Sequence, residues 1–169
     1  VVVTGSECTG KTVLTERLAE YFDCPCSPEG ARLYVEQHSR PLTVDDVNPI
    51  ASLQAELEAV AIRKARGLVI HDTDLVSTLI YARHYYGTSP EWIVRAASER
   101  TADLYLLCDI DLPWSPDGFQ RDSGAAEQRR QIHEKFVEAM TRSGLNWTLI
   151  QGSGDKRLEQ AVRKIKAFA

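Results

Sequence analysis

Short apolar segments alternate with longer segments of helical periodicity along the chain. Four of the apolar segments are rich in β-branched and aromatic residues and have the length of buried strands: residues 1–4, 68–71, 104–108 and 147–150. Residues 23–26 form a weaker fifth candidate. Strands that alternate with helices are typical of an α/β domain with a parallel sheet. We therefore predict that fold class.

The helices are predicted from apolar positions three and four residues apart and from residues that begin or end helices. Asn48-Pro49 predicts a helix start, Gly67 predicts the end of that helix, and Ser89-Pro90 predicts a further start. Asp155 stands near the start of the last helix. The apolar faces are Leu14, Leu18 and Tyr21; Leu53, Leu57 and Val60; Ile93 and Ala97; Ile132, Phe136, Val137 and Met140; and Leu158, Val162, Ile165 and Phe168.

The composition fits one domain and argues against several classes of protein. The chain has 169 residues and a net charge of -4, whereas a general nucleic-acid binder needs a positive face. No apolar run approaches the ~20 residues that cross a bilayer, and nothing resembles a signal peptide, so we expect a cytoplasmic protein without membrane contact. The four cysteines lack paired spacing and are expected to be reduced. Because the chain starts without methionine inside a strand, a further upstream domain is left open.

The segment after the first strand fits the phosphate-binding pattern G-x-x-x-x-G-K-[ST]. It consists of Gly5, Ser6, Glu7, Cys8, Thr9, Gly10, Lys11 and Thr12. Glycines let successive backbone N–H groups point at one anion, and the following helix N-terminus adds partial positive charge. We expect this P-loop to bind ATP, with Lys11 on the β- and γ-phosphates and Thr12 on Mg²⁺. An ordinary glycine turn is the alternative, which the flanking strand and helix disfavour.

Carboxylates follow two of the predicted strands. In open parallel sheets, ligands bind beyond the carboxyl ends of the strands. Asp72 and Asp74 come directly after strand 68–71, where a P-loop enzyme needs one carboxylate for Mg²⁺ and uses another for a substrate hydroxyl. Alternatively, one of the two only caps the helix that begins at Leu75. Asp109 and Asp111, after strand 104–108, are a second choice for the metal.

Charged side chains also follow the weak second strand and occupy a long loop. Glu29 and Arg32 stand three residues apart at the start of a helical pattern and form either a substrate site or a surface ion pair. The segment of about 112–130 is long enough to form a lid, and its Arg121 is placed to stabilise a transferring phosphoryl group. Arg129 and Arg130 lie off the apolar face of the next helix, so they contact ATP or form a solvated basic face.

Together these motifs resemble the ribosylnicotinamide kinase domain of the bacterial NAD regulator NadR and the related small P-loop AAA-type ATPases and kinases. The resemblance spans most of the chain and rests on the P-loop with Glu7, on Glu29 to Arg32, on Asp72-Thr73-Asp74, on Pro113-Trp114 followed by Asp117-Gly118 and an arginine, and on the last strand with Arg157. The family arginine lies two residues after the glycine, whereas Arg121 lies three after Gly118.

The resemblance implies a parallel sheet with helices on both faces, forming a single P-loop kinase domain over residues 1–169. It also implies transfer of the γ-phosphate of ATP to the 5′-hydroxyl of nicotinamide riboside or a similar nucleoside. We expect the catalytic residues to be Lys11, Asp72, Asp74 and Arg121; the Mg²⁺ ligands to be Thr12 and Asp72; the ATP site to be the P-loop with Arg129; and the substrate site to be Glu29, Arg32, Tyr34, Asp74, Trp114 and Asp117. Aromatic faces would favour a pyridinium ring.

Two other functions stay open on the sequence alone. A nucleotide-sensing ATPase module would bind ATP and regulate an attached domain without a phosphate acceptor. A nucleoside monophosphate kinase would need a basic group for the acceptor phosphate, which Arg32 could supply. The sequence does not predict the oligomeric state.

Overall fold

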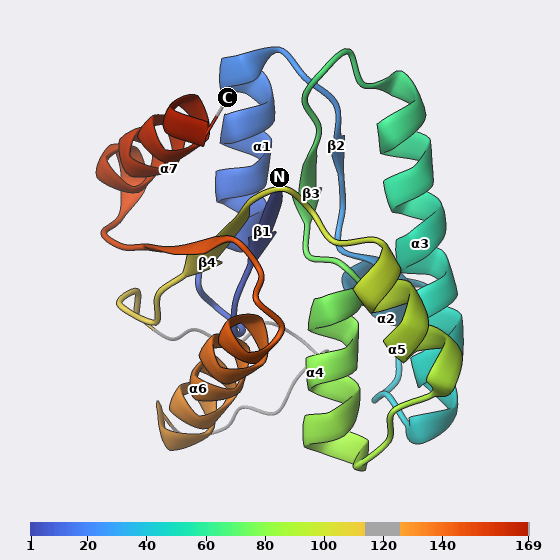
Figure 1. Ribbon diagram of the computed structural model, residues 1–169. Coiled ribbons are helices and arrows are strands. Elements are labelled where there is room, and N and C mark those ends of the chain that lie inside the picture. The colour runs from blue at the N-terminus through green and yellow to red at the C-terminus, as the bar shows by residue number, and fades with distance from the viewer. Residues whose placement is uncertain (114–125, 169) are drawn as a thin grey trace.

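The centre of the molecule is a parallel β-sheet. The structure is a computed structural model that describes residues 1–113 and 126–168. Within these residues the sheet has five strands: β1 (Val2–Thr4), β2 (Cys26–Ser27), β3 (Ile70–Asp72), β4 (Tyr105–Cys108) and β5 (Trp147–Ile150). They pair in the order β2-β3-β1-β4-β5, and every pairing is parallel (Figure 1). The predicted α/β class is confirmed.

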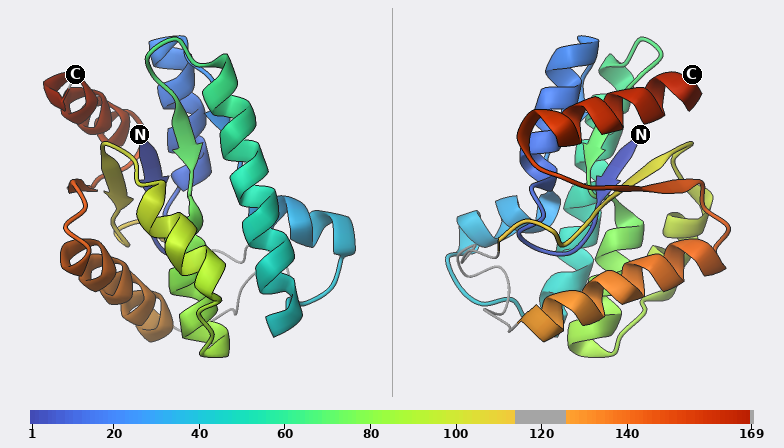
Figure 2. Two further views of the ribbon diagram at one scale, coloured as in Figure 1. Left: turned by 45° about the vertical axis from the view of Figure 1, so that its right-hand side comes forward. Right: turned by 90° about the vertical axis from the view of Figure 1, so that its left-hand side faces the viewer.

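Helices cover both faces of this sheet, as Figure 2 shows. They are α1 (Lys11–Phe22), α2 (Gly30–His38), α3 (Val47–Lys64), α4 (Leu75–Tyr86), α5 (Glu91–Glu99), α6 (Ala126–Arg142) and α7 (Gly154–Phe168), with a 3-10 turn η1 (Val44–Asp46) before α3. Because successive side chains of a strand point to opposite faces, the central strands β1 and β4 contribute to two cores. Val3 and Leu106 pack in the core that holds Leu18 of α1. Val2 and Leu107 pack in the core that holds Phe136 of α6.

Several predicted boundaries are wrong by a few residues. Helix α3 begins at Val47 rather than at the Asn48-Pro49 pair, because Asp46 accepts hydrogen bonds from the backbone N–H (2.7 Å) and hydroxyl (3.0 Å) of Thr43 and caps the preceding turn. The helix ends at Lys64, before Gly67. The second strand is Cys26–Ser27 rather than 23–26, and the third is Ile70–Asp72 rather than 68–71.

Two predicted apolar faces also differ from the buried ones. Tyr21 is 51% exposed, and its hydroxyl accepts a hydrogen bond from Lys166 of α7. In α3 the face through Leu53, Leu57 and Val60 is not the buried one, and Val60 is 39% exposed. The helix instead buries a face that contains Gln54 and Glu58. Apolar residues alone therefore misplace the inward face of α3 by a fraction of a turn.

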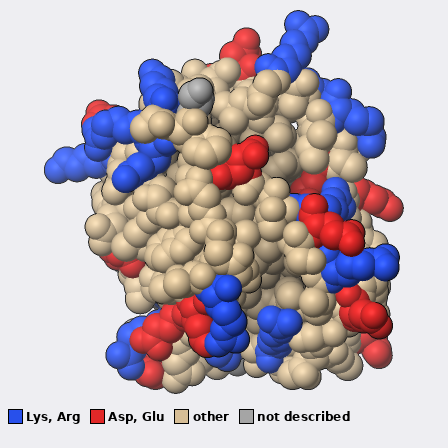
Figure 3. All heavy atoms as spheres, viewed as in Figure 1, with Lys and Arg blue, Asp and Glu red and all other residues tan. Residues whose placement is uncertain are grey.

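Figure 3 shows one face of the molecule with its charged residues coloured. Positive and negative side chains are mixed around the edge of this face, and few lie at its centre. Among the helices in the described part of the chain, none combines the length and the apolar character that a bilayer span requires. Neither observation tests the expected cellular location.

The strand order decides which loops meet at the P-loop. β1, which leads into the P-loop, lies between β3 and β4. The carboxyl end of β3 therefore brings Asp72 to one flank of the loop, and the segment after β4 runs along the other flank. This order, which the sequence does not reveal, separates the two carboxylate pairs that competed for the metal.

Candidate nucleotide and acceptor site

The backbone of the P-loop requires glycine at both ends. Gly5 has a φ of 137°, and a Cβ there would lie 2.9 Å from the carbonyl oxygen of Cys108 in the neighbouring strand. Gly10 has a φ of 73° and forms the N-cap of α1. Cys8 also has a positive φ, of 54°, which is uncommon for a residue with a side chain. The loop therefore holds a backbone shape that favours a concave row of N–H groups.

Polar side chains of the P-loop fold back onto the loop itself. The ammonium of Lys11 and the hydroxyl of Thr9 both donate to the carbonyl oxygen of Ser6, each at 2.8 Å. Lys11 is only 5% exposed, so its charge lies within the loop rather than in solvent. The hydroxyl of Ser6 is buried and has no hydrogen-bond partner in the described part of the chain. These groups are suited to receive an anionic phosphate in their midst.

Glu7 of the P-loop is held from helix α4. Its side chain is buried and accepts a hydrogen bond of 3.2 Å from the hydroxyl of Tyr81, which also lies 3.5 Å from the carbonyl oxygen of Gly5. This contact ties the first half of the loop to α4.

Asp72 meets the first turn of α1. The hydroxyl of Thr12 donates to Oδ2 of Asp72 at 2.5 Å, while the buried Oδ1 has no partner in the described part of the chain. Burial, and then the charge of Glu29, raise the pKa of Asp72 to about 6, while Lys11 acts in the opposite direction.

A hydroxyl beside a carboxylate with one oxygen to spare is a donor set that fits Mg²⁺. The described residues hold no group of three or more His, Cys, Asp or Glu side chains that could bind a metal alone. Mg²⁺ commonly takes one or two protein ligands together with substrate phosphates and water, so Thr12 and Asp72 suffice on the protein side.

Asp74 caps helix α4 and is bonded within the core. Its Oδ1 accepts from the backbone N–H (3.1 Å) and hydroxyl (3.3 Å) of Ser77, and its Oδ2 accepts from the hydroxyl of Tyr105 at 2.9 Å. Burial raises the pKa of Asp74. Both oxygens are thus engaged in the core. Of the two aspartates, the geometry favours Asp72 for the metal.

The turn between these aspartates is strained. Thr73 has a φ of 64°, in the left-handed region that β-branched residues rarely adopt, while its N–H donates to the carbonyl oxygen of Val3 at 2.9 Å. The turn sends the neighbouring carboxylates to different partners, one to Thr12 and the other into the core. Such strain is commonly found at functional sites.

Glu29 and Arg32 lie at the same edge of the sheet as Asp72. Glu29 is the N-cap residue of α2 and is only 4% exposed, and the Nε of Arg32 lies 3.9 Å from its Oε2. The ion pair between the two is therefore present, but it is not on the surface at Glu29, and the side chain of Arg32 is 36% exposed. The negative charge of Glu29 is one cause of the raised pKa of Asp72.

Gln54 of α3 joins the loops that carry Glu29 and Asp72, and sequence reasoning missed it. Its Oε1 accepts from the N–H of Gly30 at 2.8 Å, and its Nε2 donates to the carbonyl oxygen of Thr73 at 3.2 Å and to Glu58 at 3.1 Å. The side chain is 1% exposed. One signal in the sequence was available. Gln54 lies four residues from Ile50 and four from Glu58, which places it on one face of the helix with them.

The remaining predicted residues lie apart from this edge or outside the described residues. The hydroxyl of Tyr34 donates to Asp46 at 2.9 Å, and its ring stacks on His38. Arg130 is exposed and pairs with Glu127, as expected for a solvated face. Trp114, Asp117 and Arg121 fall within residues 114–125, which the structure does not describe, so their roles stay predictions.

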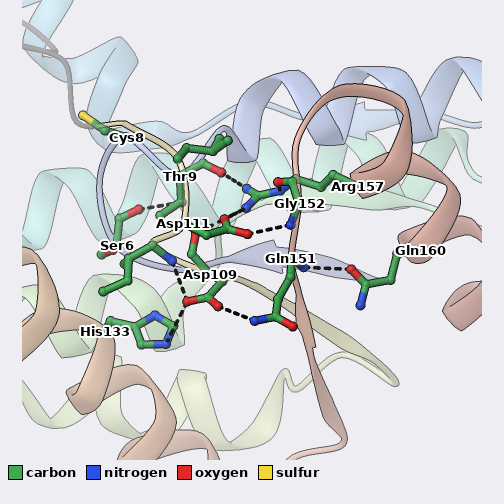
Figure 4. Close-up of polar contacts among 12 residues, drawn as sticks. Ser6, Cys8, Thr9, Asp109, Asp111, His133, Gln151, Gly152, Arg157 and Gln160 are labelled. Carbon is green, nitrogen blue, oxygen red and sulfur yellow. Dashed lines mark hydrogen bonds and ion pairs between the residues drawn. The ribbon is translucent and has the colours of Figure 1, made fainter.

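The other flank of the P-loop is a polar cluster around Asp109 and Asp111, shown in Figure 4. Asp109 accepts from Gln151 at 2.8 Å, and Asp111 accepts from the N–H of Gly152 at 2.6 Å and pairs with Arg157. The second choice for the metal is thus engaged with the β5–α7 connection. Arg129, expected at ATP, donates to the carbonyl oxygens of Cys8 (2.9 Å) and Leu112 (2.8 Å).

Comparison with known proteins agrees with this geometry. A family model described as an AAA domain matches residues 1–157. The trifunctional NAD biosynthesis/regulator proteins NadR of Escherichia coli (strain K12) and Salmonella typhimurium (strain LT2) are each 26% identical to this chain over 171 residues. The matches cover 98% of this chain but only 42% of each relative.

Solved structures show the same fold. A crystal structure of NadR in complex with NR matches with a TM-score of 0.83 at 25% identity, covering 99% of this chain and 50% of that one. NadR in complex with NAD and AMP-PNP gives 0.78 at 24% identity, with coverages of 99% and 48%. Thymidylate kinase from Ehrlichia chaffeensis gives 0.70 at 14% identity, with coverages of 98% and 96%. The resemblance to NadR is confirmed, and the chain belongs to the AAA domain family, with the α/β fold of P-loop kinases.

Proposed function

We propose that the protein is an ATP- and Mg²⁺-dependent kinase that transfers the γ-phosphate of ATP to the 5′-hydroxyl of nicotinamide riboside or a similar nucleoside. The observation that carries the proposal is the contact between Thr12 and Asp72 beside the buried Glu29. It joins a phosphate-binding loop to a carboxylate edge suited to a metal and an acceptor. The similarity to NadR, one of whose structures contains NR, supports the choice of acceptor.

The P-loop and Lys11 would hold the β- and γ-phosphates. Backbone N–H groups and the N-terminus of α1 supply the partial positive charge, and Lys11, already inside the loop, supplies a full one. Thr12 and Asp72 would hold Mg²⁺, which when bound neutralises charge on the phosphate oxygens. For phosphoryl transfer, most of the catalytic effect comes from such positioning and charge stabilisation.

The acceptor hydroxyl would lie at the edge formed by Glu29 and Asp72. Because both oxygens of Asp74 are bonded in the core, Glu29 and Asp72 are our candidates for orienting the hydroxyl and taking its proton. A nucleoside that carries a pyridinium charge suits an edge where carboxylates predominate. Arg121, Trp114 and Asp117 remain our candidates for the lid and substrate contacts.

A monophosphate acceptor is the second candidate. The guanidinium of Arg32 is partly exposed at this edge and could pair with an acceptor phosphate. The likeness to thymidylate kinase is one of fold alone.

One experiment separates these acceptors. The protein is incubated with ATP, Mg²⁺ and single acceptors, including nicotinamide riboside, other nucleosides and their monophosphates, and products are identified by mass. We expect a phosphorylated product from nicotinamide riboside or a close analogue. Product from monophosphates alone would replace the proposal with a monophosphate kinase, and ATP binding without any product would favour the sensor module.

A further inference from the structure

Two buried arginines from different helices hold consecutive carbonyl groups of the P-loop. Arg129 of α6 donates from Nη2 to the carbonyl oxygen of Cys8 at 2.9 Å, and Arg157 of α7 donates from Nη1 to the carbonyl oxygen of Thr9. Arg129 is 6% exposed and Arg157 is 3% exposed. Figure 4 shows the guanidinium of Arg157 between Thr9 and Asp111.

Holding a carbonyl also fixes the direction of the next N–H. In a trans peptide the C=O and the following N–H point to opposite sides of the chain. A donor on the oxygen of Cys8 therefore directs the N–H of Thr9 away from Arg129, and a donor on the oxygen of Thr9 directs the N–H of Gly10 away from Arg157. These are N–H groups that a phosphate-binding loop turns toward its anion.

The backbone at this point needs external support. Cys8 has a φ of 54° and Gly10 a φ of 73°. For a residue with a side chain, the left-handed region is disfavoured. Charge-assisted hydrogen bonds to the carbonyl oxygens of Cys8 and Thr9 offset that strain and select one orientation of each peptide.

Both guanidinium groups are themselves fixed by neighbouring loops. Arg157 pairs with Asp111, and its Nε donates to the carbonyl oxygen of Gly152 at 2.7 Å. Asp111 in turn accepts from the N–H of Gly152 at 2.6 Å. Arg129 donates from Nη1 to the carbonyl oxygen of Leu112 at 2.8 Å, while its buried Nε has no hydrogen-bond partner in the described residues. The charge of Arg157 is thus buried together with a carboxylate, and that of Arg129 is held by backbone carbonyl groups.

We propose that Arg129 and Arg157 are positioning residues of the phosphate-binding loop, which act on bound polyphosphate through the backbone of residues 8–10 rather than by touching it. For Arg129 this replaces the expected direct contact with ATP. The inference uses only the nucleotide-binding half of the proposed function and is independent of the acceptor.

Backbone positioning and direct contact predict different ligand profiles. A loop whose N–H groups are misdirected loses affinity for every ligand that places a diphosphate in it. The affinities for ATP, ADP and pyrophosphate should therefore fall by the same factor. An arginine that contacts the γ-phosphate would instead affect ATP much more than ADP.

The test measures dissociation constants of Mg²⁺-ATP, ADP and pyrophosphate by calorimetry for the wild type, Arg129→Gln and Arg157→Gln. Arg130→Gln, which changes an exposed arginine next to Arg129, is the matched control. We expect Arg129→Gln and Arg157→Gln each to raise all three dissociation constants about tenfold or more, since hydrogen bonds from charged groups contribute about 1.5–3 kcal/mol. The control should bind like the wild type.

A second measurement separates positioning from a general loss of structure. The amide signals of Thr9 and Gly10 are followed by NMR during pyrophosphate titration, together with the thermal midpoint of each ligand-free variant. Arg129→Lys and Arg157→Lys, which keep the charge but not the forked geometry, serve where the Gln variants do not fold. The expected result is a smaller ligand-induced shift of these two amides in a folded variant.

The outcomes that overturn the inference are distinct from failure of the proposed function. Unchanged affinities in the Arg129 and Arg157 variants, or a loss confined to ATP, would overturn the positioning role alone. A wild-type protein that binds none of the three ligands would overturn nucleotide binding and this inference together.

Discussion

The two flanks of the P-loop present opposite charges to it. On the β4–β5 side, Arg129 and Arg157 donate hydrogen bonds to loop carbonyls. On the β3–β2 side, Asp72 accepts from Thr12 and lies close to Glu29. One flank thus neutralises the oxygens that point away from the phosphates, whereas the other supplies oxygens for a cation. The glycine motif alone therefore does not form the site, because segments that are distant in the chain complete both flanks of the P-loop.

The flanks also differ in how their charges are compensated. Arg157 is paired with Asp111 inside the protein. On the acceptor side, burial and Glu29 raise the pKa of Asp72 to about 6, and its Oδ1 has no partner in the described residues. The acidic flank is therefore arranged to receive positive charge.

We expect the strongest effect at Lys11, which lies in the P-loop between its two flanks. Lys11→Ala removes the one full positive charge inside the loop, so we expect turnover to fall by about 10³-fold or more. Lys64→Ala, at the exposed end of α3, is the matched control and should keep wild-type rates. Steady-state kinetics with saturating acceptor checks both. Near-normal turnover in Lys11→Ala would contradict the assignment.

Substitution of Asp72 and of Asp74 is expected to have different effects on turnover and on stability. Asp72→Asn should lower Mg²⁺-dependent turnover about 10²-fold or more with little change in thermal midpoint, because it removes a metal ligand. Asp74→Asn should instead lower the stability by about 1–2 kcal/mol, because it disturbs a helix cap and the contact with Tyr105. Kinetics and thermal unfolding of both variants make the measurement. The reverse pattern would assign the metal to Asp74.

A variant of Gln54 tests what holds the acidic flank, which carries Glu29 and Asp72, in place. Gln54→Leu removes the bonds to Gly30 and Thr73, so we expect kcat/KM for the acceptor to fall about tenfold while the affinity for ATP stays unchanged. Gln37→Leu, on the exposed surface of α2, is the control. An equal loss of affinity for ATP and acceptor would show that Gln54 supports the fold in general rather than this flank.

The last expected effect concerns how the stability of the folded protein depends on pH. Burial, and then the charge of Asp74, raise the pKa of Glu58 to about 7. Between its ordinary pKa of 4.5 and 7 the folded protein holds this proton more tightly than the unfolded chain, so Glu58 makes stability fall as pH rises, by at most ~1.4 kcal/mol per pH unit.

Glu58→Gln should therefore flatten the pH dependence of the unfolding free energy in that window and stabilise the protein at pH 8. Urea unfolding of both proteins from pH 4.5 to 8 measures this. Identical pH profiles of wild type and variant would show that Glu58 titrates with its ordinary pKa in the folded protein.

The contiguous half of the site could be predicted from the sequence in detail, whereas for the assembled half the sequence identified candidates such as Asp72 but not the contacts that they make. Residues 5–12 form one motif whose spacing is a direct consequence of local backbone chemistry. The choice between Asp72 and Asp109 depended on strand order, which local pattern does not encode. The choice between Asp72 and Asp74 depended on the positive φ of Thr73.

Arg129 and Gln54 show a second limit of sequence reasoning. Arg129 was predicted to contact ATP because it lies off the apolar face of its helix, yet it is buried against the P-loop backbone. Gln54 was overlooked because α3 was oriented by its apolar residues. In both cases a polar side chain acts through backbone atoms of a segment far away in the chain.

We propose that the two flanks of the P-loop act together, one on ATP and the other on an acceptor. The initial rate of ADP formation by the wild-type protein with Mg²⁺-ATP, measured with and without nicotinamide riboside, tests this. We predict that the acceptor stimulates ADP formation and that phosphorylated riboside appears in equal amount. ADP formation that is the same with and without every nucleoside and monophosphate tried would contradict the account.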